Sequence, residues 1–220
     1  MNGKNVKKIE SIDLLKMESR FRASFINSLG GFKSVILIGT KNFEGQENLA
    51  IFNSLIHLGA NPALCAFIVR PDLSPRHTLE NILETKFYTI NHLNENIYKA
   101  AHQTSARYPK GNSEFEAVGL KSEQKETFFA PFVKESLIKF GCEFVQKIPI
   151  ELNGTTLIIG KIIEIYIPEN CIRQDGFVDI EQAGTLTVSG LDSYHSTKKI
   201  ARLSYAKPDL IPTELIYQKE

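Results

Sequence analysis

Two short segments carry side chains that could bind a phosphate or a flat polar ring. Residues 52–55 read Phe-Asn-Ser-Leu and place an amide beside a hydroxyl at the end of an otherwise apolar stretch. Between residues 70 and 78, Arg70, Arg76 and Thr78 come together just before a predicted helix. A helix N-terminus offers free N–H groups and the positive end of the helix dipole, and arginine adds a planar fork of donors. This second segment therefore has the chemistry of a phosphate site.

A third segment, residues 103–108, is a hydroxyl-rich turn after a predicted helix and contains Thr104 and Ser105. Each of the three segments also has a purely structural explanation, which we favour when the segment is considered alone. The amide–hydroxyl pair suits a strand end, the arginine segment suits a solvated loop with a Thr N-cap, and the third segment suits the end of a helix. Their order and spacing along the chain, taken together, favour a binding site.

The sequence contains none of the common catalytic or nucleotide-binding motifs. It lacks G-x-G-x-x-G after a strand, G-x-x-x-x-G-K-[ST], H-E-x-x-H and G-x-S-x-G. The five histidines share no metal-ligand spacing and are interpreted as surface or hydrogen-bonded residues. We therefore predict no metal site, and no side chain is identified as a required general acid or base.

The composition is that of an ordinary globular protein. Of 220 residues, 42% are hydrophobic and 23% are charged, and 26 Lys+Arg balance 25 Asp+Glu for a net charge of +1. This balance argues against a nucleic-acid partner. The three cysteines form no C-x-x-C pair and are expected to be reduced, packed thiols, which suits a cytoplasmic protein.

Neither the N-terminus nor the longest uncharged stretch predicts a targeting or membrane segment. The first 18 residues alternate in charge and contain no apolar h-region. Residues 48–69 carry no Asp, Glu, Lys or Arg and are long enough to span a bilayer, but Asn53, His57 and the Asn61-Pro62 pair interrupt them. We expect two buried strands joined by a turn, with a membrane span as the alternative.

The remaining elements are predicted from periodicity and turn residues. Helices are expected over residues 13–29, which end at Gly30-Gly31, over 77–84, and over 94–103 with Asn94 as N-cap. A loop is predicted around Pro71, Ser74 and Pro75. Strands are expected over residues 34–40, 48–58, 64–69, 87–91, 142–150 and 155–167, the last two joined by a Leu-Asn-Gly turn.

Two stretches are expected to be irregular: residues 104–131, as a long polar loop, and the tail beyond Tyr205, as extended chain. About six or seven strands with few, short helices predict a mainly β fold, a closed or partly closed β-barrel. With no internal repeat and no linker, residues 1–220 are interpreted as one domain, with a core of about 20–195 and N- and C-terminal extensions.

Six segments give the chain a resemblance to a known family. In order and at compatible spacing, they resemble the motifs of the flavin reductase-like, FMN-binding split-barrel proteins, and specifically their flavoredoxin-like branch. None of the six is specific by itself, but the resemblance runs from about Phe21 to Tyr194. The segments are residues 48–53 with Asn61-Pro62, 76–82, 87–91, 104–106, 114–115 with 119–120, and 190–194.

The resemblance implies a Greek-key split barrel that forms a homodimer and binds FMN near the subunit interface. By position, the flavin ring would lie along one set of residues, a second set would hold the phosphate, and a third would close the site. No catalytic side chain is implied, because the flavin carries the redox chemistry. The three sets are Phe52, Asn53, Ser54 and Leu55; Arg70, Arg76 and Thr78; and Thr104, Ser105 and Ala106.

The chain departs from the family pattern at several of these positions. The family Pro-Phe-Ser is Ile51-Phe52-Asn53 here, and Lys-Asp-Thr is Arg76-His77-Thr78, which keeps the cation and the hydroxyl but not the carboxylate. The terminal R-L-G-G motif has no arginine here, since residues 188–191 read Val-Ser-Gly-Leu. A cation and a threonine remain sufficient for a phosphate.

Three functions are consistent with these observations. The first is an FMN-binding oxidoreductase that accepts hydride from NAD(P)H and passes electrons to free flavin or another acceptor, with FAD as the alternative cofactor. The second is an FMN electron carrier of the flavoredoxin type without NAD(P)H turnover, which would have an electron-transfer partner. The third is a split-barrel binding module that has lost flavin. None of the three involves nucleic acid or a membrane.

Overall fold

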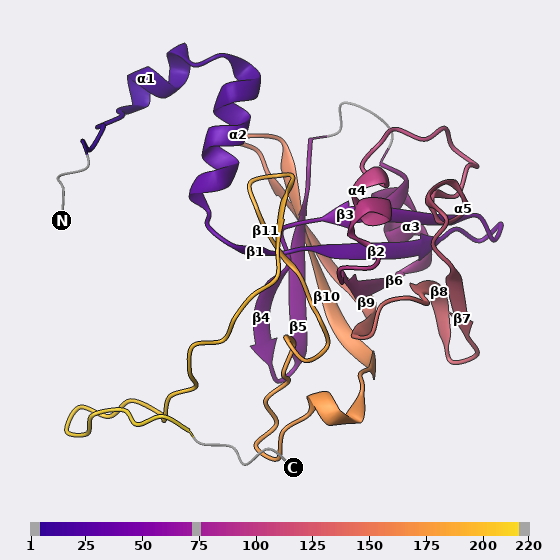
Figure 1. Ribbon diagram of the computed structural model, residues 1–220. Helices are drawn as coiled ribbons and strands as arrows, with labels where there is room; N and C mark the ends of the chain where they lie inside the picture. Colours follow the sequence, from indigo (N-terminus) through magenta and orange to yellow (C-terminus); the bar gives the residue numbers. More distant parts are fainter. Residues whose placement is uncertain (1–4, 72–75, 216–220) are drawn as a thin grey trace.

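The computed structural model describes residues 5–71 and 76–215 (Figure 1). Of the loop predicted around Pro71, Ser74 and Pro75, the structure describes Pro71, which belongs to no helix or strand, whereas Ser74 and Pro75 lie outside the described residues. Among the described residues, no helix is both long and apolar enough to cross a membrane. The same part of the chain contains no group of three or more His, Cys, Asp or Glu that could hold a metal ion.

The chain is mainly β, as predicted, and its centre is a seven-stranded antiparallel sheet. The sheet order is β3-β2-β6-β9-β10-β5-β4, so the two edge strands follow each other in the sequence. The strands are β2 Ile36–Lys41, β3 Glu47–Phe52, β4 Ile56–Ala60, β5 Ala63–Val69, β6 Phe87–His92, β9 Lys139–Ile150 and β10 Thr155–Tyr166.

The sheet curls until its ends approach each other. The three residues between β3 and β4 carry Ser54, whose Oγ accepts a hydrogen bond from the Ile68 N–H at 3.0 Å and donates to the Ile68 carbonyl at 3.4 Å. Because Ile68 belongs to β5, this contact fastens the end of one edge strand to the opposite side of the sheet. The predicted partly closed barrel is confirmed.

Alternation along the strands gives the sheet two apolar faces. On the inner face, Ile36 and Ile38 of β2 pack with Phe67, Tyr88 and buried residues of β9 and β10. On the outer face, Leu37 packs in a second cluster with residues of two short helices. Apolar side chains therefore fill the inside of the barrel, and a second set of apolar side chains covers its outer face.

Most of the short elements lie around the barrel, whereas α1 stands away from it (Figure 1). A small sheet of order β1-β11-β12 combines the start of the barrel with a late segment, and β7 pairs with β8. The remaining elements are α1 Ser11–Lys16, α2 Ser19–Leu29, β1 Lys33–Ser34, α3 His77–Thr85, α4 Tyr98–Gln103, α5 Glu114–Val118, β7 Ser122–Lys125, β8 Phe128–Val133, the 3-10 helix η1 Glu169–Cys171, β11 Thr187–Ser189 and β12 Ser193–His195.

Two predicted elements are each divided in two. The helix expected over residues 13–29 is broken at Met17, which is extended, because the Glu18 side chain accepts a hydrogen bond from the Phe21 N–H and starts α2 afresh. The strand expected over residues 48–58 is interrupted between β3 and β4. β4 was predicted to be buried, but most of its residues are exposed.

The residues after β6 differ from the prediction in two ways. The first helix, α4, is shorter than predicted, and the stretch that follows it is more regular. The helix expected from residue 94 begins only at Tyr98, because Asn94 Oδ1 accepts a hydrogen bond from the Asn96 N–H and holds a turn instead. The long loop expected over residues 104–131 contains α5, β7 and much of β8. The tail beyond Tyr205 was expected to be extended, but it folds back on itself, because Lys207 and Leu210 form an antiparallel bridge and the Leu215 N–H donates to the Arg202 carbonyl at 2.8 Å. All three cysteines are free and buried.

We expect Gly160→Ala to lower the free energy of unfolding by about 1–3 kcal/mol. Gly160 lies on β10 beneath Tyr88, which fills the barrel, and a Cβ at this position would overlap the Tyr88 hydroxyl. The measurement is urea unfolding followed by fluorescence or circular dichroism.

The matched control is Gly59→Ala on β4, where the nearest atom to the new Cβ is the Pro62 carbonyl oxygen at 3.5 Å, an ordinary contact. Its stability is expected to stay within about 1 kcal/mol of the wild-type value. Equal stability of the two variants would contradict the packing described for the barrel interior.

Candidate functional site

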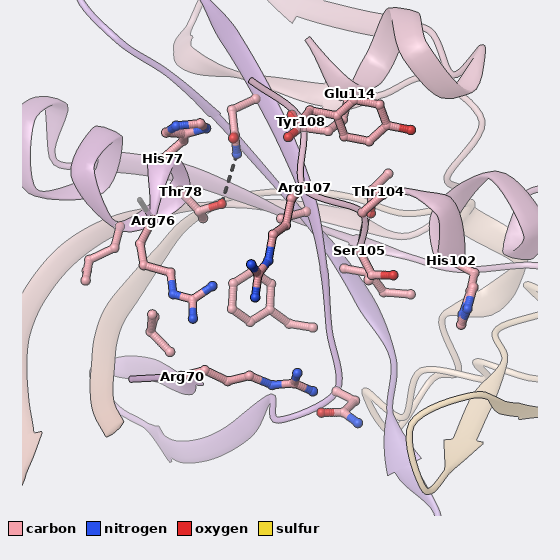
Figure 2. Close-up of a pocket in the computed structure, with 18 of the residues that line it drawn as sticks. Arg70, Arg76, His77, Thr78, His102, Thr104, Ser105, Arg107, Tyr108 and Glu114 are labelled. Atoms are coloured by element: carbon pink, nitrogen blue, oxygen red, sulfur yellow. Dashed lines mark hydrogen bonds between the residues drawn. The ribbon is translucent and has the colours of Figure 1, made fainter. Parts of the chain in front are cut away.

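One cavity of about 640 Å³ collects almost all of the predicted binding residues. Its wall is formed by the end of β3, the segments on either side of the undescribed residues, the turn after α4, and the β11–β12 hairpin (Figure 2). The predicted residues that line it are Phe52, Asn53, Ser54, Arg70, Arg76, Thr78, Thr104, Ser105 and Ala106.

Leu55 is the exception. It does not line the cavity, and its side chain packs against the cluster inside the barrel. The hydrogen bonds of Ser54 to Ile68 turn the chain at this point, so the next side chain faces the core rather than the cavity.

Three guanidinium groups point into the same part of the cavity, those of Arg70, Arg76 and Arg107 (Figure 2). Arg76 is held in place because its Nη2 donates to the Pro71 carbonyl at 2.8 Å and its backbone N–H donates to Glu80 Oε1 at 3.3 Å. Its Nε is buried and has no hydrogen-bond partner among the described residues. A buried donor without a partner is costly, so this atom is well suited to an anionic ligand.

Thr78 lies beside these arginines in the first turn of α3 and is buried. Its Oγ1 accepts a hydrogen bond from Asn48 Nδ2 at 2.9 Å, drawn as a dashed line in Figure 2. Because the oxygen is engaged as an acceptor, the hydroxyl hydrogen remains available to donate into the cavity. No side chain caps α3, so the helix N-terminus adds its own positive end to this corner.

The outer edge of β3 forms a second wall of the site. β3 pairs only with β2 in its sheet, and the Leu49 N–H on its other side donates to Glu114 Oε2 at 3.0 Å. Backbone groups alternate in direction along an antiparallel strand. The N–H groups of Ile51 and Asn53 therefore face the same way as that of Leu49, toward the cavity that both residues line.

A backbone carbonyl anchors the end of this edge. Asn53 Nδ2 donates to the Gly190 carbonyl at 3.1 Å, and Lys33 Nζ donates to the same oxygen at 3.0 Å. Gly190 has a positive φ of 63°, a conformation that glycine adopts without strain. This contact holds the β11–β12 hairpin against the strand that lines the cavity.

A histidine and a tyrosine meet on the cavity wall. His102 Nδ1 lies 2.8 Å from the Tyr194 hydroxyl, within hydrogen-bond distance. Burial of Tyr194, together with the negative charge of Asp192, raises the pKa of its phenol above the ordinary value. The phenol therefore carries its proton at neutral pH.

The sequence interpretation did not assign several lining residues. Glu114, His102 and Tyr194 meet their partners only through long-range folding, so no local pattern identifies those contacts. Arg107 lies in the hydroxyl-rich turn and was not assigned a role. Its positive charge among hydroxyl groups could have indicated an anion-binding residue. The further lining residues that were missed include His77, Glu80, Tyr108 and Lys110.

Among the charged residues that line the cavity, four are basic and two are acidic. One of the basic groups is partly offset, since Lys110 Nζ lies 4.0 Å from Glu80 Oε2. The resulting positive excess favours an anionic ligand. The basic residues are Arg70, Arg76, Arg107 and Lys110, and the acidic residues are Glu80 and Glu114.

The sequence model of the flavin reductase like domain matches residues 30–183, most of the chain. A solved structure of a proposed flavin reductase with a split barrel domain, from Shewanella frigidimarina NCIMB 400, is 50% identical in sequence. The similarity covers 91% of this chain and 100% of that one, with a TM-score of 0.88.

Two further solved structures are similar in fold at lower identity. Nitrilotriacetate monooxygenase component B from Bacillus cereus is 19% identical, covers 91% of this chain and 100% of its own, and has a TM-score of 0.80. Flavoredoxin of Desulfovibrio vulgaris (Miyazaki F) is 20% identical, covers 81% of this chain and 92% of its own, and has a TM-score of 0.67. These likenesses confirm the split barrel predicted from the sequence.

The buried carboxyl of Glu114 generates a pH-dependent prediction. Burial raises its pKa above the ordinary 4.5, and the hydrogen bond from the Leu49 N–H opposes this effect only in part. The folded state therefore binds this proton more tightly than the unfolded state. The stability that comes from the protonated carboxyl is present below the ordinary pKa and is lost as the pH rises through the folded pKa.

Glu114→Gln keeps an acceptor for Leu49 and removes this titration. We expect its melting temperature, relative to wild type, to improve as the pH is raised from about 4 to about 7. Glu116→Gln removes an exposed carboxyl of the same helix and serves as the matched control for the loss of one acidic side chain. If the difference in melting temperature between Glu114→Gln and wild type did not change with pH, the raised pKa of Glu114 would be ruled out.

Proposed function

This chain belongs to the flavin reductase-like domain family, and on that premise we propose that it is an FMN-binding oxidoreductase that takes hydride from NAD(P)H. The electrons then pass to free flavin or another acceptor. When bound, FMN supplies the two-electron chemistry, and the protein binds the cofactor, orients it and sets its surroundings.

The single observation that carries the proposal is the anion-binding corner at the start of α3. It combines the partnerless buried Nε of Arg76, the Thr78 hydroxyl and an uncapped helix N-terminus. Arg70 and Arg107 point into the same space (Figure 2). These groups fit a phosphate, because each presents a donor or a positive charge and none presents a carboxylate to the ligand.

The remainder of the cavity fits the flat heterocycle of a flavin. The strand edge offers the N–H groups of Ile51 and Asn53, in the orientation that suits ring carbonyls. Phe52 and Ser54 complete this wall, and the turn after α4 closes the opposite one with Thr104, Ser105 and Ala106.

The charge of the cavity fits the phosphate of FMN. The lining carries two more basic than acidic side chains, which matches the charge of about −1.5 to −2 on a phosphate monoester at neutral pH. The pyrophosphate of FAD would in addition require space for an adenosine beyond the corner at α3.

We also propose a homodimer of single-domain chains in the cytoplasm. Exposed apolar side chains on two strands of the barrel, β4 and β10, which lie on either side of β5, support the dimer, since exposed apolar surface commonly marks interfaces. Free, buried cysteines are typical of a reducing compartment. The exposed side chains are Ile56 and Leu58 of β4 and Ile163 and Ile165 of β10.

The purified protein, incubated with FMN and desalted, is expected to show a flavin absorption spectrum that bleaches on anaerobic addition of NADH or NADPH. A spectrum that persists with both donors would replace the reductase with an electron carrier. A colourless protein would refute FMN binding, and it would also refute both the reductase and the electron-carrier functions.

We expect the double substitution Arg76→Ala with Thr78→Ala to weaken FMN binding by about tenfold to a hundredfold, because both side chains are assigned to the phosphate. Riboflavin, which lacks the phosphate, should bind wild type and variant equally. The measurement is the quenching of flavin fluorescence on titration with protein.

Lys147→Ala, an exposed cation on β9 away from the cavity, controls for the loss of net charge and should leave both affinities unchanged. Equal weakening of FMN and riboflavin would show a damaged cavity rather than a lost phosphate contact. Unchanged FMN affinity would refute the assignment of the corner.

A further inference from the structure

We propose that Tyr194, held by His102, donates a proton to an organic acceptor that is reduced in this cavity, and that the acceptor is of the class that takes up a proton on two-electron reduction, of which a quinone serves as the probe. The inference rests on the proposed function, because a bound, reduced flavin is the source of the electrons. It adds a proton donor and a substrate class to a site for which the sequence identified neither.

The position of the pair separates it from the anion-binding corner. His102 lies in the last turn of α4 and Tyr194 lies in β12, and both line the cavity. Figure 2 shows His102 on the other side of the cavity from Arg70 and Arg76. A ligand whose phosphate occupies the corner at α3 therefore leaves this pair to face the ring or a second molecule bound beside it.

The hydrogen bond of 2.8 Å gives the pair the form of a proton relay. With Nδ1 protonated, His102 donates to the phenolic oxygen, and the phenol hydrogen is left to point into the cavity. Tyr194 is half-buried, whereas His102 is exposed, so the imidazole connects the phenol to bulk water. Protons can thus reach the cavity along a fixed path.

Packing does not require the hydroxyl of Tyr194. Its ring lies 5.6 Å from that of Tyr98, centroid to centroid, and it packs against the cluster on the outer face of the sheet. Phenylalanine would make the same apolar contacts. The Tyr194 hydroxyl and the His102 imidazole are therefore available for interaction with a ligand in the cavity and are not needed for packing of the core.

The pair supplies what two-electron reduction of a quinone needs. The quinone gains a hydride equivalent from the reduced flavin and one proton from Tyr194, which breaks the Tyr O–H bond and completes the hydroquinone. The phenolate recovers its proton from His102, and His102 recovers one from water. Ferricyanide, in contrast, takes one electron and no proton, so it does not use the pair.

The test compares these two kinds of acceptor. Wild type, Tyr194→Phe and His102→Gln are loaded with FMN, reduced anaerobically with dithionite, and mixed with menadione or ferricyanide in a stopped-flow instrument. Reduction by dithionite makes the outcome independent of NAD(P)H. We expect Tyr194→Phe to slow the menadione reaction at least about tenfold. The ferricyanide reaction should slow much less.

His102 acts through Tyr194 and is a positioning residue, so its variant needs a readout that altered packing would not change. His102→Gln should slow menadione selectively, as Tyr194→Phe does, and the menadione reaction of wild type should slow in D₂O more than the ferricyanide reaction. In the flavin-free protein, the nitrogen NMR signal of His102 Nδ1 should shift in Tyr194→Phe, because its hydrogen-bond partner has been removed.

Tyr98→Phe is the matched control, since it removes a neighbouring phenol that does not line the cavity. It should react like wild type with both acceptors. An unchanged menadione rate in Tyr194→Phe would overturn the proposal, as would a parallel loss with both acceptors or an unchanged NMR signal. A wild-type protein that retains no flavin would instead defeat the proposed function itself, and this inference with it, before any variant is compared.

Discussion

The hydrogen bonds between Ser54 and Ile68 bring the two ends of a curled sheet together, and the cavity depends on this closure. One side of the contact continues into Phe52 and Asn53, and the other continues into Arg70. Phe52 belongs to the edge strand β3, and Arg70 follows β5, the strand next to the opposite edge. Only three residues join β3 to β4, so this short connection and the Ser54–Ile68 contact together bring binding residues from the two sides of the sheet into one cavity.

A buried polar network holds the anion-binding corner rigid. Asn48 Nδ2 donates to both Thr78 and Thr40, and Asn81 Nδ2 of α3 donates to the same Thr40 hydroxyl oxygen at 3.1 Å. These side chains couple the first turns of α3 to β2 and β3. A site fixed in this way loses little conformational entropy when a ligand binds, which is the usual route by which a preformed pocket gains affinity.

The sequence predicted what local patterns determine. Arg76 and Thr78 were assigned because a cation and a hydroxyl at the start of a helix have a recognisable chemistry, and the barrel followed from strand patterns and turns. Leu55 was predicted to lie along the flavin ring, but it does not line the cavity, because a tertiary hydrogen bond one residue earlier turns the chain. The contacts Glu114–Leu49 and His102–Tyr194 span 65 and 92 residues, and no spacing rule reaches so far. The helix at residues 13–29 failed for a different reason, since one capping carboxylate outweighed a continuous apolar pattern.

The outer edge of β3 has a consequence for solubility. An exposed strand edge is a template for pairing with another chain, and folded proteins cover or block such edges. Here Glu114 and α5 cover the edge at Leu49, while the next two outward N–H groups open onto the cavity. In the proposed complex, a flavin ring along these N–H groups would stand where an eighth strand would add. Cofactor binding would then also protect the edge against association with another chain, and a lineage that lost the cofactor would need another way to shield the strand.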